Sequence, residues 1–349
     1  MKILLLGAFG PGALEHYYLR GFRKQAINCD TFDITDQYYT AIGKSIVTKA
    51  VNKIYPAYFF NGINNSLLEW LKEKKYDVII VFKGHTLFPS TIARLKEYCS
   101  FLNCYNPDHP FIFYSAGSGN KNVSESIRLY DLYLSYSQNI AEALRERFGV
   151  ASAVIPFGYD DEAPLAKSAP VEVVNKFLLI GAYDKQRSEM IEWLQTEKLV
   201  IYGDDKWAHR TDGSSRSRKF YANKALYGQQ YVDAIAGGAG VFNFLRTQNI
   251  SEGSHNMRTF EVPGYGGLMI SQRTPEQESF FEDNKEAVYF GNRDELNDKI
   301  RFIESNPAFA DSIKKNAFLK CRQMGFGYNQ RAVQWVEILK TTLGSAISK

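Results

Sequence analysis

The sequence KFLLIGAYD at residues 176–184 repeats, near the middle of the chain, the pattern of KILLLGAF at residues 2–9. Each stretch is a continuous apolar run that leads into a glycine turn, which is typical of a strand buried on both faces of a parallel sheet. Residues 159–175 separate the two halves and contain two prolines, small residues and charges, a composition typical of a linker. We therefore expect two α/β domains, each opening with its own first strand.

Further apolar runs alternate with helical segments in both halves. The predicted strands of the first half are residues 28–34, 76–84, 100–106, 131–137 and 151–158, and those of the second half are 198–204, 239–245, 267–272 and 286–291. Strands that alternate with helices indicate parallel sheets. The sequence predicts an N-terminal α/β domain over residues 1–165 and a C-terminal one over 166–328. An amphipathic helix then begins at residue 329, beyond the last predicted strand.

Length and charge exclude several classes of protein. The 349 residues exceed the size at which a single core usually stops growing, roughly 250–300 residues. The chain is 45% hydrophobic, which excludes wholesale disorder. Its 42 basic and 38 acidic residues give a net charge of +4, which is too mild for a dedicated DNA-binding protein. We therefore do not expect a nucleic-acid partner.

Cysteine spacing and apolar run length indicate the compartment. No apolar run approaches the roughly 20 residues of a membrane-spanning helix. The four cysteines, Cys29, Cys99, Cys104 and Cys321, match neither a zinc pattern nor a compact disulfide framework. We expect reduced thiols and a cytoplasmic protein. The aromatic residues, 14% of the chain, are interpreted either as core residues or as rings that line a sugar or nucleotide cleft.

The most informative stretch runs from Asn249 to Ser271, NISEGSHNMRTFEVPGYGGLMIS. A polar loop that enters a helix presents backbone N–H groups to an anion, and Arg258 can add a bidentate contact to a phosphate. Glu261 follows about one helical turn later on the same face, where its carboxylate could accept hydrogen bonds from ribose hydroxyls. On residue types alone, the stretch is more typical of an ordinary helix start with a salt bridge and a glycine-rich turn.

An ordered set of short motifs extends this stretch in both directions. In chain order they are Ile180–Arg187, Ile201–Asp204 with Trp207, Arg258–Glu261, Gly266–Ile270, Glu286–Phe290, Glu295–Leu296 and Tyr328–Arg331. Over about residues 176–335 the set resembles the C-terminal half of family-4-like, GT-B-fold glycosyltransferases (glycosyl transferases group 1). Within that group it is most similar to the branch of spore-maturation-type proteins. Over residues 1–165 the similarity is mainly topological.

The resemblance implies both a fold and an activity. Two Rossmann-like domains would face each other across a cleft, and the C-terminal helix, residues 329–349, would cross back onto the N-terminal domain. A nucleotide-sugar donor, such as a UDP-, GDP- or dTDP-sugar, would bind the C-terminal domain. A glycan or lipid-linked glycan acceptor would bind the N-terminal domain, as in polysaccharide biosynthesis, with peripheral association at the inner membrane face. No metal or other cofactor would be needed, because basic residues and helix N-termini stabilise the departing diphosphate.

The resemblance also implies roles for individual residues. Glu261 would bind the ribose, and Arg258 would meet the diphosphate together with Ser254 and Asn256. The remaining donor-side residues would be Arg187 with Lys185 as a second cationic contact, and Tyr202 and Gly203 beside the base, although Tyr202 alone is equally typical of a core. One departure concerns the two glutamates, separated by seven residues, that many retaining members of the family carry. Here Glu252 and Glu261 are separated by eight, so retention of the anomeric configuration does not follow.

The acceptor-side candidates lie where predicted strands of the first half end. Glu15 and His16 follow the glycine-rich turn after the first strand, His85 follows the strand at 76–84, and Asp108 follows the strand at 100–106. A base that deprotonates an acceptor hydroxyl is expected at such positions. If the reaction inverts the anomeric centre, the candidates are Asp108, His16 and His85, in that order. If it retains the configuration, these residues would bind the acceptor.

Two other interpretations remain open. The basic segment AHRTDGSSRSRKFYAN at residues 208–223 is interpreted first as a surface loop, and otherwise as a contact for an anionic acceptor. For the whole chain, the alternatives to a glycosyltransferase are a nucleotide-sugar epimerase of the same fold and a catalytically silent sugar- or nucleotide-binding protein. The intact arginine–glutamate pair at Arg258 and Glu261 argues against the silent protein, because a retired site need not keep it, whereas an epimerase would need carboxylates from both domains around one sugar.

Overall fold

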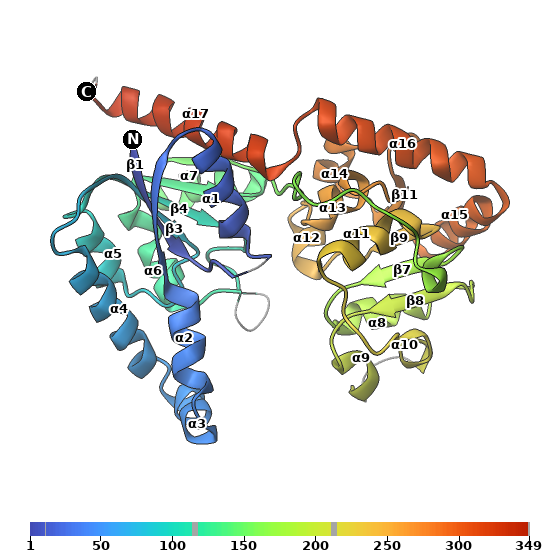
Figure 1. Ribbon diagram of the computed structural model, residues 1–349, viewed down its shortest axis with the longest axis horizontal. Coiled ribbons are helices and arrows are strands. Elements are labelled where there is room, and N and C mark those ends of the chain that lie inside the picture. The colour runs from blue at the N-terminus through green and yellow to red at the C-terminus, as the bar shows by residue number, and fades with distance from the viewer. Residues whose placement is uncertain (11, 114–117, 211–214, 348–349) are drawn as a thin grey trace. The chain divides into compact units, whose positions relative to one another are not determined.

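The computed structural model describes residues 1–10, 12–113, 118–210 and 215–347 (Figure 1). It divides into two compact units: unit 1 comprises Met1–Pro156 and Tyr328–Lys349, and unit 2 comprises Phe157–Gly327. The division therefore precedes residue 165, where the linker composition placed it. Residues after Pro156 belong to unit 2 because the Phe157 N–H donates to Nε2 of His255 (3.3 Å) and Tyr159 forms a β-bridge with Gly327.

Unit 1 is built on a six-stranded parallel sheet in the order β2-β1-β3-β4-β5-β6. The strands are β1 (Lys2–Gly7), β2 (Asn28–Asp33), β3 (Tyr76–Phe82), β4 (Cys99–Asn106), β5 (Leu132–Ser135) and β6 (Ser152–Val154). The central strands are largely apolar, and Val78, Ile79, Ile80 and Val81 of β3 are fully buried. Burial on both faces explains why these strands are continuous apolar runs rather than alternating ones.

The helices of unit 1 connect these strands and cover the sheet. They are α1 (Leu14–Lys24), α2 (Ile34–Gly43), α3 (Ile46–Ile54), α4 (Ala57–Leu71), α5 (Pro89–Leu95), α6 (Lys121–Ser126), α7 (Gln138–Phe148) and α17 (Tyr328–Ile347), with a 3-10 turn at Ile127–Leu129. Helices α2 and α3 were not predicted from the sequence, and α3 contributes no buried residue to the unit.

The last helix, α17, packs on α1 as the resemblance implied. Trp335 of α17 is completely buried and donates from Nε1 to Oδ1 of Asn103 in β4 (2.8 Å). Its ring lies 4.8 Å from that of Tyr18 in α1, centroid to centroid. A Cβ on Gly21 would lie 2.5 Å from Cβ of Ala332, so only glycine lets the two helices approach this closely. Much of the aromatic content of unit 1 is therefore core.

Unit 2 is built on a five-stranded parallel sheet in the order β11-β10-β9-β7-β8. The strands are β7 (Phe177–Ile180), β8 (Leu199–Tyr202), β9 (Gly240–Asn243), β10 (Met269–Gln272) and β11 (Val288–Phe290). Each strand that the sequence predicts in either half overlaps one of the observed strands β1 to β11. Two parallel α/β sheets confirm the predicted fold class.

The helices of unit 2 surround this second sheet. They are α8 (Lys185–Ile191), α9 (Lys206–His209), α10 (Ser215–Phe220), α11 (Gly228–Gly237), α12 (Thr247–Ser251), α13 (Arg258–Gly264), α14 (Pro275–Phe280), α15 (Arg293–Ser305) and α16 (Pro307–Gln323), with a 3-10 turn at Val171–Val173. A buried cluster that includes Phe177, Trp207, Phe242 and Ile313 joins sheet and helices. All four cysteines are free thiols. Among the residues described, none of the helices has the length and apolarity needed to cross a membrane.

Candidate functional site

The sheet of unit 2 has a topological switch point between β7 and β9. The chain leaves β7 for β8 on one side and later crosses to β9 on the other, so the loops after β7 and β9 diverge. Open α/β sheets bind ligands in the crevice outside the carboxyl ends of their strands at such a point. Helix α8 follows β7, and α12 and α13 follow β9, so residues from these three helix starts meet there.

Two arginines converge on Gly181, the residue that follows β7. A Cβ on Gly181 would lie 3.1 Å from Nη2 of Arg258 and 3.4 Å from Nη1 of Arg187. Arg187 is held in place by a hydrogen bond from its Nε to the carbonyl oxygen of Phe244, just after β9 (2.9 Å). The two guanidinium groups that the sequence assigned to the diphosphate therefore lie against the same stretch of backbone.

Helix α8 places Arg187 at the edge of the sheet. The Asp184 carboxylate accepts the backbone N–H of Arg187 (3.2 Å) and caps a helix that starts at Lys185. Arg187 therefore lies in the first helical turn, only 7% exposed, beside the end of β7. Lys185, the other cation predicted here, is exposed, and its Nζ lies 3.9 Å from Oε1 of Glu189.

The arginine cluster carries an excess of positive charge, which favours a negatively charged ligand. Burial lowers the pKa of Arg187 to about 9, and the neighbouring charges of Arg258 and Arg246 act in the same direction, while Asp184 opposes them. The guanidinium still carries its proton at pH 7. Among the described residues, none of these three arginines forms an ion pair with an acidic side chain. A polyanion bound here would supply the missing negative charge.

Arg258 shows the same incomplete partnering. It opens α13 and is half-buried, and its Nε is a buried nitrogen without a hydrogen-bond partner among the described residues. A buried donor left without a partner costs free energy, and such donors mark sites where a ligand or an ordered water completes the bonding. Arg246, which precedes α12, was not predicted from the sequence, although it directly follows the predicted strand at 239–245.

The backbone beneath the arginines is fixed by a tight junction between β7 and β8. A Cβ on Gly203 would lie 2.1 Å from the carbonyl oxygen of Gly181, so only glycine fits. The same carbonyl accepts a hydrogen bond from Nε1 of the buried Trp207 (2.9 Å). Gly203, predicted beside the nucleotide base, is thus a packing residue here. Tyr202, the other predicted base neighbour, is 1% exposed and belongs to the core.

Glu261 lies three residues after Arg258 on the first turns of α13. Its Oε2 accepts a hydrogen bond from the hydroxyl of Tyr231 in α11 (2.8 Å), and Oε1 accepts none from a described residue. Burial raises the pKa of Glu261, while the charge of Arg258 and the Tyr231 hydrogen bond lower it. The carboxylate therefore keeps one oxygen available as an acceptor, as a ribose hydroxyl would require.

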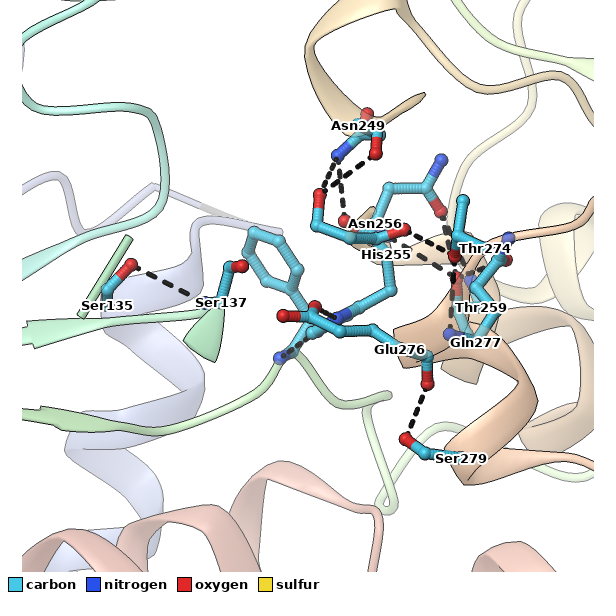
Figure 2. Close-up of polar contacts among 12 residues, drawn as sticks. Ser135, Ser137, Asn249, His255, Asn256, Thr259, Thr274, Glu276, Gln277 and Ser279 are labelled. Atoms are coloured by element: carbon cyan, nitrogen blue, oxygen red, sulfur yellow. Dashed lines mark hydrogen bonds and ion pairs between the residues drawn. The ribbon is translucent and has the colours of Figure 1, made fainter. Parts of the chain in front are cut away.

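A buried polar network holds the loop between α12 and α13 (Figure 2). Asn256 donates from Nδ2 to Oδ1 of Asn243 (2.8 Å), and its Oδ1 accepts the backbone N–H of Thr259 (3.2 Å). The Thr259 hydroxyl donates in turn to Oε1 of Gln277 (2.9 Å). Asn256, predicted as a diphosphate contact, is committed to this network. Its partners Asn243 and Gln277 were not predicted, because their role depends on contacts far apart in the chain.

Ser254 and His255 also serve the loop itself. The Ser254 hydroxyl is completely buried and accepts a hydrogen bond from Nδ2 of Asn249 (3.2 Å), so a ligand could reach it only after these contacts break. Nδ1 of His255 forms a hydrogen bond with Oε2 of Glu276 (2.7 Å; Figure 2). Gly253 has a φ of 60°. The turn therefore demands glycine at the position where the resemblance would place the first of the two glutamates.

The basic segment at residues 208–223 is engaged in surface ion pairs. Arg216 and Lys219 of α10 both bind Glu197, at 2.7 Å and 2.5 Å, and these bonds lower the pKa of that carboxylate. Residues 211–214 lie outside the described residues. The paired cations favour the first interpretation, a surface segment, over an anion contact.

Unit 1 has its own switch point, between β1 and β3. Nζ of Lys83, after β3, forms an ion pair with Oδ2 of Asp108, after β4 (2.7 Å). Glu15 of α1 accepts the backbone N–H of Ala8, after β1 (3.1 Å). Burial raises the pKa of Glu15, with the nearby charge of Asp33 acting in the same direction and that of Lys83 opposing it. This edge therefore collects charges of both signs.

The two histidines predicted as bases lie in different surroundings. His16 is exposed on the outer face of α1 beside Leu19 and Arg20, whereas its neighbour Glu15 turns toward β1. Burial, together with the charge of Lys83, lowers the pKa of His85 to about 4. His85 is therefore neutral and a weak base at pH 7. Of the three predicted bases, the structure brings only Asp108 into contact with another charged residue of the edge.

Residues 185–337 match the family model described as "Glycosyl transferase-like". No curated protein sequence gives a significant match to the chain. Among solved structures, the chain is similar to a sucrose-phosphate synthase from Thermosynechococcus elongatus, with a TM-score of 0.71 and 11% identity over 99% of this chain and 100% of that one.

Two further structures cover nearly the whole chain. HepE from Anabaena in complex with UDP has a TM-score of 0.59 and 13% identity, over 98% of this chain and 100% of that one. A protein described as a UDP-N-acetylglucosamine 2-epimerase from Listeria monocytogenes has a TM-score of 0.55 and 13% identity, over 99% and 98%. At identities of 11–13%, the similarity to these structures concerns the fold alone. The chain therefore has the GT-B fold of glycosyltransferases, and its similarity to the spore-maturation-type branch stays a prediction.

Proposed function

We propose that this protein transfers a sugar from a nucleoside-diphosphate donor, such as a UDP-, GDP- or dTDP-sugar, to a glycan or lipid-linked glycan acceptor. The observation that carries the proposal is the arginine cluster at the switch point of unit 2. Arg187 and Arg258 converge on Gly181, and neither forms an ion pair with an acidic residue among those described. A diphosphate has the charge and the oxygen geometry that two guanidinium groups bind best.

The arginines would act on the leaving group. When the bond between the anomeric carbon and the diphosphate breaks, negative charge develops on the departing phosphate oxygen. Fixed guanidinium groups stabilise that charge without rearranging, because Arg187 is already held by Phe244 and Arg258 is packed against Gly181. We propose that these cations do the work for which other transferases use a divalent metal, so that transfer is metal-independent.

Glu261 would select the nucleoside part of the donor. Its Oε1 accepts no hydrogen bond from a described residue and can accept one from a ribose hydroxyl, while Tyr231 fixes the orientation of the carboxylate through Oε2. Arg258 lies on the same helix one turn earlier. The spacing between the two side chains along α13 suits a ligand in which a ribose adjoins a diphosphate.

We place the acceptor at the carboxyl edge of the unit 1 sheet. The Lys83–Asp108 ion pair and the partly buried Glu15 supply hydrogen-bond acceptors and one cation there. Such a set can orient sugar hydroxyls, and a carboxylate of raised pKa takes up a proton at a higher pH than an ordinary glutamate does. Because the charges of this edge are mixed, it lacks the excess positive charge that a diphosphate requires.

The test begins with a thermal-shift screen of the purified protein against UDP, GDP and dTDP, with and without EDTA. A ligand that binds the folded state raises the melting temperature by mass action. The best nucleotide, supplied as its sugar, is then followed for release of the nucleoside diphosphate. Release that survives EDTA supports a metal-independent transferase. Conversion of the donor sugar to its epimer, with no transfer to an acceptor, would indicate the epimerase instead. The absence of a thermal shift with every nucleotide would refute the proposal.

A further inference from the structure

Helix α3 of unit 1 exposes its apolar side to solvent. Ile46 and Ile54 are 86% and 85% exposed and Val47 is 69% exposed, and none of the nine residues of α3 is buried. At 100° per residue, the apolar residues of α3, which are Ile46, Val47, Ala50, Val51 and Ile54, occupy one continuous face. An amphipathic helix of a globular protein normally turns this face toward the core.

The polar side of α3 faces the protein instead. Asn52 accepts a hydrogen bond at Oδ1 from the hydroxyl of Tyr38 in α2 (2.9 Å). The Thr48 hydroxyl donates to the carbonyl oxygen of Ile42 at the end of α2 (2.8 Å) and completes a capping box with Ser45. These bonds fix the rotation of the helix about its axis. The apolar face therefore points outward because the polar face is anchored.

Exposed tyrosines flank the apolar face of α3 along the chain. Tyr55 and Tyr58 are 57% and 63% exposed at the junction of α3 and α4, and Tyr39 of α2 is 59% exposed. Figure 1 shows α2 and α3 extending beyond the sheet of unit 1, with α3 at the end farthest from it. We call the surface formed by Tyr39, Ile46, Val47, Val51, Ile54, Tyr55 and Tyr58 the α3 patch. Contiguous apolar surface of this kind marks a binding site for a protein or a membrane.

The charges on α3 and on the residues that flank it in the chain have one sign. Lys44, Lys49 and Lys53 are all exposed, and no aspartate or glutamate occurs between Asp36 and Glu69. The lysines of α3 lie along one edge of its apolar face, from where their long side chains can reach outward beside it. The combination of apolar residues, tyrosines and lysines is typical of helices that lie in the interface of an anionic bilayer.

We propose that the α3 patch docks unit 1 onto an anionic lipid bilayer, with Ile46, Val47 and Ile54 in the acyl boundary and the lysines at the lipid phosphates. Tyrosines suit the headgroup level, where one end of the ring is apolar and the other is wet. A second copy of this chain is the rival occupant. The uncompensated lysines disfavour it, because a symmetric contact through the patch would bring like charges together.

The experiment measures co-sedimentation of the full chain with vesicles. One set is phosphatidylcholine alone and the other contains about 30% phosphatidylglycerol, which gives an anionic surface. We expect binding to the anionic vesicles that weakens as salt rises from about 0.05 M to 0.5 M, because salt screens the lysines. The Ile46→Ser/Ile54→Ser variant should lose binding by at least about tenfold, and Lys49→Gln/Lys53→Gln by a similar factor.

The matched control is Val171→Ser, which removes an apolar side chain that is 89% exposed in unit 2. It should bind vesicles as the wild type does. Equal binding of wild-type protein to neutral and anionic vesicles, no binding to either, or unchanged binding by the serine variant would each overturn the proposal. A wild-type dimer in sedimentation velocity that the serine variant abolishes, without vesicle binding, would assign the patch to a second copy.

A second measurement does not depend on the apolar variants. Tyr55→Trp places a reporter in the α3 patch, and Tyr227→Trp places one at a position that is 79% exposed in unit 2. Both variants keep the native tryptophans, so the emission of each is compared with that of the wild type. Anionic vesicles should shift the added emission of Tyr55→Trp to shorter wavelength and leave that of Tyr227→Trp unchanged. Equal behaviour of the two reporters would contradict insertion of the patch.

Discussion

The carboxyl edges of the two sheets differ in the sign of their charge. Both sheets are parallel and both have a switch point beside their first strand. At the edge of unit 2, Arg187, Arg246 and Arg258 gather without an ion pair to an acidic residue among those described. At the edge of unit 1, Lys83 is neutralised by Asp108, and Glu15 adds a further carboxyl group.

This difference teaches how one architecture can hold two kinds of ligand. An uncompensated group of cations costs the folded protein free energy, which a bound polyanion recovers. A balanced pair costs little by itself and leaves oxygens for hydrogen bonds to neutral hydroxyls. We therefore expect substitutions at the unit 2 edge to change donor affinity strongly, and substitutions at the unit 1 edge to change transfer while leaving donor affinity intact.

The largest expected effect on donor affinity comes from Arg258→Gln. Losing a charge-assisted contact to the diphosphate should weaken nucleoside-diphosphate binding by about 100-fold, as measured by calorimetry. The melting temperature of the ligand-free variant should not fall, because the substitution removes a half-buried cation from beside Arg187. The matched control is Arg301→Gln, which removes an exposed arginine that pairs with Asp298. Lost affinity together with a lower melting temperature would indicate a structural role.

Glu261→Gln should have a smaller and more selective effect. Replacing the charged acceptor should weaken binding of the nucleoside diphosphate by about tenfold. Inorganic pyrophosphate, which has no ribose, should bind the variant as it binds the wild type. A parallel loss for both ligands would mean that Glu261 acts through Arg258 and not on the ribose.

Donor affinity should also depend on pH through Glu261. Burial raises the pKa of this carboxyl group, so it takes up a proton at a higher pH than an ordinary glutamate. A protonated carboxyl is a poorer acceptor, and nucleotide affinity should therefore fall as the pH falls through this raised pKa. Calorimetry from neutral to mildly acidic pH checks the trend, and Glu261→Gln should remove it. An identical pH dependence in that variant would assign the titration to another group.

The smallest effect on donor affinity is expected at the unit 1 edge. Asp108→Asn removes an ion-pair partner of Lys83 and should change nucleoside-diphosphate affinity by less than about twofold, because Asp108 makes none of the donor contacts proposed for unit 2. Transfer to an acceptor should slow, because a carboxylate at this edge no longer orients or deprotonates a hydroxyl. A large loss of donor affinity in this variant would break the proposed division between the two edges.

The sequence predicted the strands and part of the site for physical reasons. Buried parallel strands are continuous apolar runs, so periodicity was sufficient to find them. Arg258 and Glu261 were singled out by their spacing on one helical face, but their assignment to a nucleotide depended on the resemblance, because the residue types alone favoured an ordinary helix start. Ser254 and Asn256 have the same residue types as phosphate ligands, but their hydroxyl and amide groups are used within the loop, which only long-range contacts reveal.

The direction in which a side chain points could not be predicted from the residue types, because it depends on the rotation of the helix about its axis. Glu15 and His16 are adjacent in sequence, yet the turn of α1 points Glu15 toward β1 and leaves His16 exposed. Arg246 lies outside any motif, and its contribution depends on its distance from Arg187 in space. Helix α3 was not predicted, and the exposure of its apolar face depends on the hydrogen bonds of Thr48 and Asn52 to α2, which only the fold reveals.

A crystal structure of the protein soaked with UDP, or with the nucleotide that gives the largest thermal shift, tests the central claim most directly. The account predicts the two phosphates within hydrogen-bond distance of the guanidinium groups of Arg187 and Arg258, and a ribose hydroxyl on Oε1 of Glu261. A nucleotide bound at the carboxyl edge of unit 1, or phosphates elsewhere on unit 2 with both arginines unoccupied, would contradict it.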